Sequence, residues 1–127
     1  MDHQPDPTQA ELEILNVLWR HGPTTVREVH DAVAGKRDVG YTTVLKTMQL
    51  MAEKGLVTRD ESARSHVYVA AVPEQRVKRR IVTDLMERVF EGSAADLVQQ
   101  ALSSRKTSRK EIEQIRDLLD RHSRGER

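Results

Sequence analysis

The stretch "VGYTTVLKTMQLMAEKGLV", residues 39–57, decides the fold because it carries two patterns in one helix-length segment. Val44, Met48 and Met51 recur with the spacing of a single helix face. That spacing predicts a helix over residues 41–54 with one side buried. The other side carries hydroxyls, an amide and a lysine, where a helix that needs only solubility more often has Glu–Lys pairs. This composition indicates a helix that contacts something other than water.

Two shorter helices are predicted before this segment. Each begins with the S/T-x-x-E pattern of a capping box, formed by Thr8 with Glu11 and by Thr25 with Glu28. A Gly-Pro pair at 22–23 ends the first of them. The polar, glycine-ended "KRDVG" then indicates a turn into the third helix.

A β-hairpin is predicted directly after the third helix. The runs "LVTRD" and "HVYVAAV" are rich in β-branched residues and are separated by the polar "ESARS". Three short helices followed by a hairpin describe a winged helix-turn-helix. The predicted fold class is therefore mostly α, with a winged DNA-binding domain over residues 1–72.

Residues 73–127 are predicted to form a helical dimerisation domain. Three amphipathic stretches occur here: "PEQRVKRRIVTDLMERVFEG", "SAADLVQQALSS" and "SRKEIEQIRDLLDRHS". Their apolar stripes have little to bury against within one small chain, so a second copy is the simplest partner. The residues predicted to form this homodimer contact are Leu85, Val89, Phe90, Leu97, Leu102, Ile112, Ile115, Leu118 and Leu119.

Composition excludes several function classes. The 127 residues contain no cysteine, which rules out disulfides, thiolate metal sites and Cys nucleophiles. No apolar run approaches the ~20 residues of a membrane span, and "MDHQPDP" is unlike a signal peptide. We therefore expect a cytoplasmic chain without membrane insertion. The five histidines lack paired ligand spacing and no catalytic motif occurs, so neither a metal, a cofactor nor an enzyme is predicted.

The charge distribution does not by itself indicate a nucleic-acid partner. Residues 1–72 hold eight Lys/Arg against ten Asp/Glu, a balance of −2, and residues 73–127 hold thirteen against ten, a balance of +3. A DNA interface must therefore rest on the local placement of side chains.

The third helix supplies that placement. In a helix-turn-helix, the second helix of the motif enters the major groove. Threonine can bond a base edge or pack on a thymine methyl, glutamine can pair with adenine, and lysine can meet guanine or phosphate. The predicted DNA-binding residues are Tyr41, Thr42, Thr43, Lys46, Thr47 and Gln49 on the helix, with Arg59 and Arg64 flanking the wing loop.

These residues also have structural interpretations that involve no DNA. Thr42 or Thr43 alone can be an N-cap, and Lys46 alone can be a solvated charge. Two other function classes also stay open: a winged protein-interaction adaptor that does not bind DNA, and a small-molecule-sensing regulator. Leu50 and the net negative charge of residues 1–72 favour the adaptor, whereas a sensor would need a pocket lined by aromatic side chains.

The predicted DNA-binding domain, residues 1–72 or the head, resembles the BlaI/MecI family of penicillinase repressors; residues 73–127 are the tail. "YTTVLKTMQLMAEKGLV" followed by "RDESARSHVYVA" carries the resemblance, and "ELEILNVLW" and "TVREVHDAV" match the first two helices, so it covers roughly residues 8–72. The ending "EIEQIRDLLD" extends it less tightly into the tail. The resemblance implies a homodimeric repressor whose heads each read half of a palindromic double-stranded DNA operator upstream of resistance or stress genes.

The sequence also departs from that family. Members of the family often have a basic residue at the position where this chain has Leu50. Induction of penicillinase members by proteolysis at an Asn-Phe bond implies a membrane-bound sensor protease as partner. The matching place here is near Gln100 and Ala101, and the chain contains no Asn-Phe pair. Copper-responsive relatives use C-terminal cysteines, which are absent.

Overall fold

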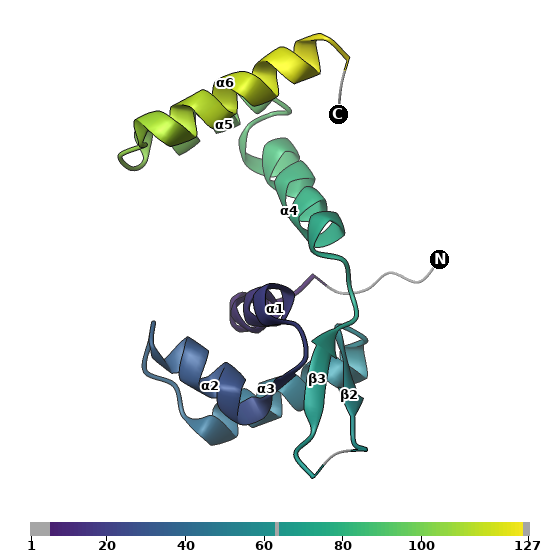
Figure 1. The fold of residues 1–127 in the computed structure, drawn as a ribbon. Coiled ribbons are helices and arrows are strands. Elements are labelled where there is room, and N and C mark those ends of the chain that lie inside the picture. The colour runs from purple at the N-terminus through teal and green to yellow at the C-terminus, as the bar shows by residue number, and fades with distance from the viewer. Residues whose placement is uncertain (1–5, 63, 126–127) are drawn as a thin grey trace. The chain divides into compact units, whose positions relative to one another are not determined.

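The computed structural model describes residues 6–62 and 64–125 (Figure 1). His3, one of the five histidines, and the last two residues of the chain lie outside this range. The element order is α1 (Gln9–His21), β1 (Thr24–Thr25), α2 (Val26–Ala34), α3 (Tyr41–Lys54), β2 (Val57–Asp60), β3 (Val67–Ala70), α4 (Glu74–Val89), α5 (Ala94–Ser103) and α6 (Arg109–Ser123). The predicted fold class, mostly helical with a winged helix-turn-helix, is confirmed.

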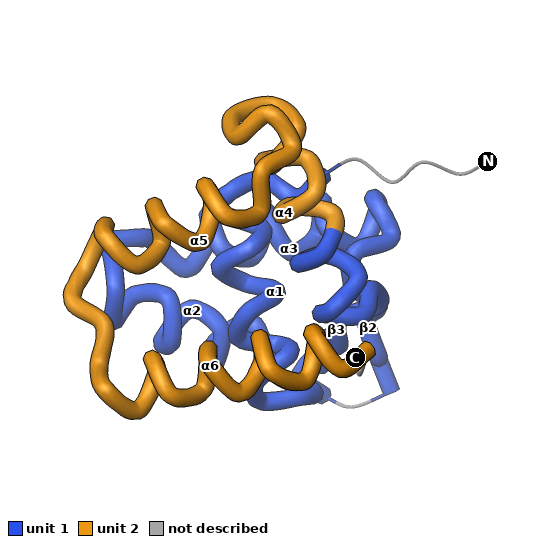
Figure 2. The backbone as a smooth tube through the Cα atoms, turned by 90° about the horizontal axis from the view of Figure 1, so that it is seen from above, with its two compact units in different colours: residues 1–79 blue, residues 80–127 orange. Residues whose placement is uncertain are grey.

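The chain divides into two compact units, residues 1–79 and residues 80–127 (Figure 2). The first unit contains α1 to α3 and the sheet. Helix α4 begins in the first unit and ends in the second, which also contains α5 and α6.

Both predicted capping boxes are present in the first unit. The Thr8 N–H donates to Glu11 Oε1 at 2.8 Å, and the Glu11 N–H donates back to Thr8 Oγ1 at 3.2 Å. Thr25 and Glu28 make the same reciprocal pair at the start of α2. Each box satisfies amide donors that a helix start otherwise leaves without partners.

The sheet is antiparallel, with β3 between β1 and β2. Thr24 of β1 lies opposite Tyr68 of β3, and Val57 of β2 lies opposite Ala70. The β2–β3 wing was predicted, whereas β1 was not. A strand of two residues is too short to show an alternating pattern, and Thr25 serves at the same time as the N-cap of α2.

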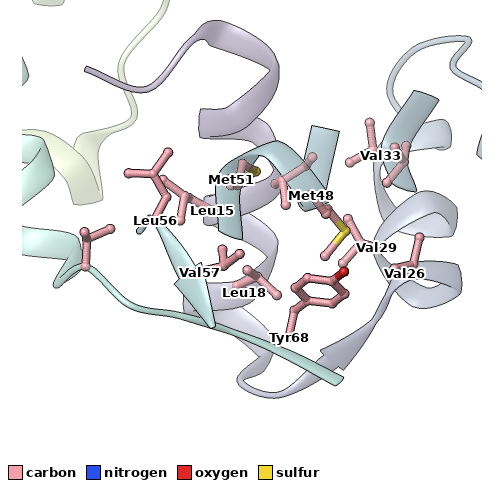
Figure 3. Packing of buried hydrophobic residues seen from close by; sticks show 13 residues of the cluster. Leu15, Leu18, Val26, Val29, Val33, Met48, Met51, Leu56, Val57 and Tyr68 are labelled. Atoms are coloured by element: carbon pink, nitrogen blue, oxygen red, sulfur yellow. The ribbon is translucent and has the colours of Figure 1, made fainter. Parts of the chain in front are cut away.

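The core of the first unit lies between α1, α2, α3 and the sheet (Figure 3). Val44, Met48 and Met51 of α3 are buried as their spacing predicted. Figure 3 shows the Tyr68 ring extending from β3 toward Val29 of α2. The buried apolar residues are Ile14, Leu15, Leu18, Val26, Val29, Val33, Val44, Met48, Met51, Leu56, Val57, Tyr68 and Val72.

Glu11 has a second role beyond capping, because it is the buried acid of the described residues. Its Oε2 accepts a hydrogen bond from Lys54 Nζ at 2.7 Å, which joins α1 to the end of α3. Burial alone would raise the pKa of the Glu11 carboxyl, but hydrogen bonds from Lys54 and from the Thr8 backbone outweigh it and lower the pKa. Gly55 then ends α3 in the left-handed region, at φ 83°, which glycine adopts without strain.

The second unit has a different character. None of the described residues in α4, α5 or α6 is buried. Large apolar side chains on all three helices face solvent in the single chain, namely Ile81, Val82, Leu85, Val89, Val98, Leu102, Leu118 and Leu119. Such a surface is characteristic of a region that packs against another molecule.

The buried ion pair generates a test of stability. Because the folded pKa of Glu11 lies below its ordinary value of 4.5, the stabilisation is present above that pH and is lost as the pH falls through the folded pKa. We expect Glu11→Gln to lower the free energy of unfolding at pH 7 by about 1–3 kcal/mol. The fluorescence of Trp19, the only tryptophan, reports unfolding of the first unit in urea.

Glu13→Gln is the matched control, because Glu13 pairs with Arg37 in a more exposed position on the same helix. We expect it to cost less than about 1 kcal/mol. Equal costs for the two variants at pH 7, or a Glu11 effect that does not shrink in acid, would contradict the role assigned to the buried pair.

Candidate nucleic-acid interface

The outward side of α3 is set by its buried side. Each residue advances a helix by about 100°, so a residue two positions from a buried one lies on the opposite side, about 200° away. Thr42, Lys46 and Gln49 each stand two positions from Val44, Met48 or Met51, and all three are exposed. The structure therefore brings a hydroxyl, an ammonium and an amide onto one solvent-facing side.

The start of α3 shows that its threonines are not caps. Gly40 is the N-cap of α3 and makes no side-chain cap hydrogen bond, unlike the Thr and Ser caps of α1, α2, α5 and α6. The interpretation of Thr42 or Thr43 as an N-cap is therefore wrong. Both residues are exposed and their side chains are available to a ligand.

Thr47 is placed differently from the other threonines. Its hydroxyl donates to the Thr43 carbonyl oxygen at 2.8 Å, one turn earlier in α3, and the residue is half-buried. The hydroxyl proton is thus used inside the helix. Only the lone pairs and methyl group of Thr47 remain for an external contact.

Tyr41 is held at the start of α3 by two side chains of α2. The guanidinium carbon of Arg27 lies over the ring, 4.7 Å from its centroid. His30 meets the same ring edge-on, with the centroids 6.0 Å apart. His30 Nε2 also lies 3.0 Å from the Val39 carbonyl oxygen, in the loop that leads into α3. These contacts fix the start of α3 against α2.

A cleft of about 380 Å³ lies between the start of α2, the side of α3 and the wing. Three arginines line it, Arg27, Arg59 and Arg64, together with the imidazole of His66. Tyr41 and Gln49 line it from α3, and no Asp or Glu is among its described lining residues. An acid-free cleft with several cations attracts anions.

The two predicted wing arginines differ in their surroundings. Arg59 Nη2 donates to Glu61 Oε2 at 2.9 Å. Hydrogen bonding with Tyr68, and then with Glu61, raises the pKa of the Arg59 guanidinium. Arg64 is exposed and has no ion pair among the described residues. The charge of Arg64 is therefore available to a ligand, whereas that of Arg59 is already neutralised.

Sequence reasoning missed Arg27 and His66. A base in the first turn of a helix opposes the helix dipole, and that signal singles out Arg27. The contact between Arg27 and Tyr41 joins different elements, and no local pattern reveals it. His66 enters the cleft through the register of the hairpin.

The residues predicted for dimerisation all lie in α4, α5, α6 or just beyond α4. Five of them are exposed: Leu85, Val89, Leu102, Leu118 and Leu119. Four are half-buried: Phe90, Leu97, Ile112 and Ile115. Gln100 and Ala101, the predicted place of a proteolytic switch, are exposed but helical within α5.

Two further features are absent from the part of the chain that the structure describes. That part holds no group of three or more His, Cys, Asp or Glu side chains able to bind a metal ion. It also holds no helix with the length and apolar character needed to cross a bilayer.

Comparison with known proteins identifies the family. The family described as Penicillinase repressor matches residues 7–121, nearly the whole chain. The chain belongs to the penicillinase repressor family. Within it, the "Transcriptional regulator BlaI" of Mycobacterium tuberculosis is 42% identical over 59 residues, which cover 46% of this chain and 43% of that protein. The "Penicillinase repressor" of Staphylococcus aureus is 21% identical over 117 residues, covering 92% and 93% of the two chains.

Two solved structures of BlaI share the fold. The solution structure of the DNA-binding domain of the repressor BlaI has a TM-score of 0.52 and 24% identity, covering 58% of this chain and 90% of that one. The monomeric form of Bacillus licheniformis BlaI in complex with the blaP half-operator has a TM-score of 0.51 at 24% identity, covering 59% and 92%. The match of the family model over residues 7–121 confirms the predicted BlaI/MecI resemblance. The family consists of transcriptional repressors and not of enzymes, as the sequence predicted.

Proposed function

We propose that this penicillinase repressor family member binds a palindromic operator as a homodimer and represses transcription by covering promoter DNA. The observation that carries the proposal is the outward side of α3, where Thr42, Lys46 and Gln49 are exposed together. From Tyr41 to Leu50 the helix contains no acid that would repel phosphate. Because its DNA partner lies in the cytoplasm, we place the protein there.

Each side chain on this surface has a partner in the major groove. The Gln49 amide can pair with both N6 and N7 of adenine, and Lys46 can donate to guanine O6 or N7. Thr42 and Thr43 combine a hydroxyl with a methyl group, which suits a phosphate on one side and a thymine methyl on the other. Sequence reading from α3 then supplies specificity, and the wing adds backbone contacts.

The two rival functions receive less support. An adaptor surface would be acidic or apolar, and on the outward side of α3 Leu50 is the single large exposed apolar residue after Tyr41. A small-molecule sensor would need a pocket lined by aromatic side chains such as Trp19, but the Trp19 Nε1–H donates to the Val72 carbonyl oxygen at 3.0 Å. That indole is already part of the packing of the first unit.

The exposed apolar side chains of the second unit support dimerisation. Fully burying a Leu or Val side chain stabilises by about 1.5–3 kcal/mol, so a few of them suffice to offset the cost of association. A dimer presents two α3 helices, which must reach half-sites about one helical turn apart, ~34 Å, or a multiple of it. Linking the heads raises the effective concentration of the second head after the first has bound.

Derepression must then weaken the dimer or detach the heads. We propose that the segment around Gln100 and Ala101 is where a sensor protease would act. Both residues are exposed, but a protease binds an extended chain, so α5 must unwind locally before cleavage. Without an Asn-Phe pair, a protease of different specificity is required.

The groove assignment is tested with an operator selected by the full-length protein from a random duplex library. We expect Lys46→Ala to weaken binding and to lower the slope of log Kd against log salt by about one, because one cation that neutralises phosphate charge at the groove is lost. Thr43→Ala should weaken binding with little change in slope. Lys36→Ala, an exposed lysine in the loop after α2, is the control. Unchanged affinity and slope for Lys46→Ala would remove α3 from the groove.

The wing gives a second test on the same operator. Because Glu61 already neutralises Arg59, we expect Arg64→Ala to lower the salt slope more than Arg59→Ala. Fluorescence anisotropy at several salt concentrations measures both slopes. A larger loss of slope for Arg59→Ala would show that the ion pair opens on DNA and that the free-state wing is not the binding conformation.

Dimerisation through the second unit is tested by introducing negative charges on its exposed apolar surface. We expect the double variant Leu118→Asp with Leu119→Asp to sediment as a monomer, because two carboxylates cannot be buried without partners. Leu50→Asp is the matched control, since Leu50 is an exposed leucine of the first unit. A dimer that survives the double change would assign the contact to other residues.

A further inference from the structure

Arg27 is a fixed cation without an oxygen partner. It lies in the first turn of α2, is exposed, and its guanidinium carbon sits over the Tyr41 ring at 4.7 Å. This contact with the ring immobilises the side chain through its charge. Among the described residues, no carboxylate or carbonyl accepts a hydrogen bond from its N–H groups. A guanidinium held in this way presents a donor fork that is ready for an external acceptor.

The surroundings of Arg27 favour an anion as that acceptor. The cleft it lines also contains Arg64 and His66 from the wing, and its described lining includes no acid. Glu61 neutralises Arg59 and lies 3.9 Å from His66 Nε2. Arg27 of α2 and Arg64 of the wing therefore supply most of the uncompensated charge that lines the cleft.

We infer that Arg27 binds one phosphate of the DNA backbone next to the half-site, with the Tyr41 ring as its positioning residue. This inference rests on the proposed function. Tyr41 and Gln49 belong both to the cleft and to the outward part of α3, so a duplex seated on α3 brings its backbone past the cleft. Two phosphate oxygens can accept two parallel hydrogen bonds from the N–H groups of one guanidinium. Because no Asp or Glu is among the described residues that line the cleft, the N–H groups of Arg27 are available for such a pair.

This contact would give α2 a part in binding that carries no sequence information. A phosphate contact fixes the register and angle of the protein on the duplex, while α3 reads the bases. His30 contributes indirectly, because its ring touches Tyr41 and its Nε2 lies beside the Val39 carbonyl oxygen. A chain of contacts thus links the Arg27 guanidinium, the Tyr41 ring and the loop before α3.

The test pairs protein variants with single neutral phosphates. Full-length wild type and Arg27→Ala are titrated with the selected operator in which one phosphate at a time is replaced by a methylphosphonate. We expect Arg27→Ala to weaken binding to selected and random duplexes alike, about tenfold for a lost charge-assisted contact, and to lower the salt slope by about one. One methylphosphonate should weaken wild type but leave Arg27→Ala unchanged.

Two control variants separate this role from a structural one. Arg27→Lys keeps the charge but loses the planar fork, so it should retain the salt slope and lose part of the affinity. Arg20→Ala removes an exposed base of α1 that does not line this cleft, and it should change neither quantity. The urea midpoint read by Trp19 should be the same for wild type, Arg27→Lys and Arg20→Ala, and Arg27→Ala should lower it only by the small contribution of an exposed cation–π contact.

The outcomes distinguish the inference from the proposed function. If wild type binds no duplex, the proposed function fails and this inference fails with it. If wild type binds but Arg27→Ala keeps the salt slope, or if the effects of the variant and of every methylphosphonate are additive, only the inference is overturned. Saturable binding of inorganic phosphate that Arg27→Ala abolishes, with an unchanged DNA slope, would assign the cleft to a free anion and overturn it as well.

Discussion

Met48 and Met51 are completely buried, and Val44 nearly so, in the core that α3 shares with α1, α2 and the sheet. This packing fixes the rotation of α3 about its own axis. A turn of the helix by one residue, about 100°, toward Thr43 and Thr47 would bring their hydroxyls into the core and leave polar groups without water. The ion pair between Glu11 and Lys54 holds the far end of the same helix. The exposure of Thr42, Lys46 and Gln49 is a consequence of these constraints.

The two units differ in the burial of their apolar side chains, and we relate this difference to their proposed roles. The first unit buries its own and displays polar groups on α3 and around the adjacent cleft. The second leaves leucines and valines of α4, α5 and α6 in solvent. The proposed repressor uses the first unit to read DNA and the second to hold two copies together. Within the first unit, α3 is proposed to read base edges while Arg27 and Arg64 hold the backbone.

Much of the fold could be predicted because its signals are local. The capping boxes at Thr8 and Thr25, the helical period of α3 and the β-branched runs of the wing each span a few residues. What escaped prediction joins distant segments. Strand β1 exists only through its pairing with β3, Glu11 meets a lysine 43 residues away, and the Arg27 guanidinium finds the Tyr41 ring from another helix. Such contacts depend on packing, which no local pattern encodes.

The central claim is that the outward side of α3 lies in the major groove, and nuclear Overhauser contacts between the protein and a selected duplex test it most directly. Methyl labelling of threonine makes the side chains of Thr42 and Thr43 visible in the complex. The account predicts contacts from these methyl groups to major-groove base protons or thymine methyls. Contacts confined to another surface of the first unit, such as the groove lined by Asn16 and Lys36, would contradict it.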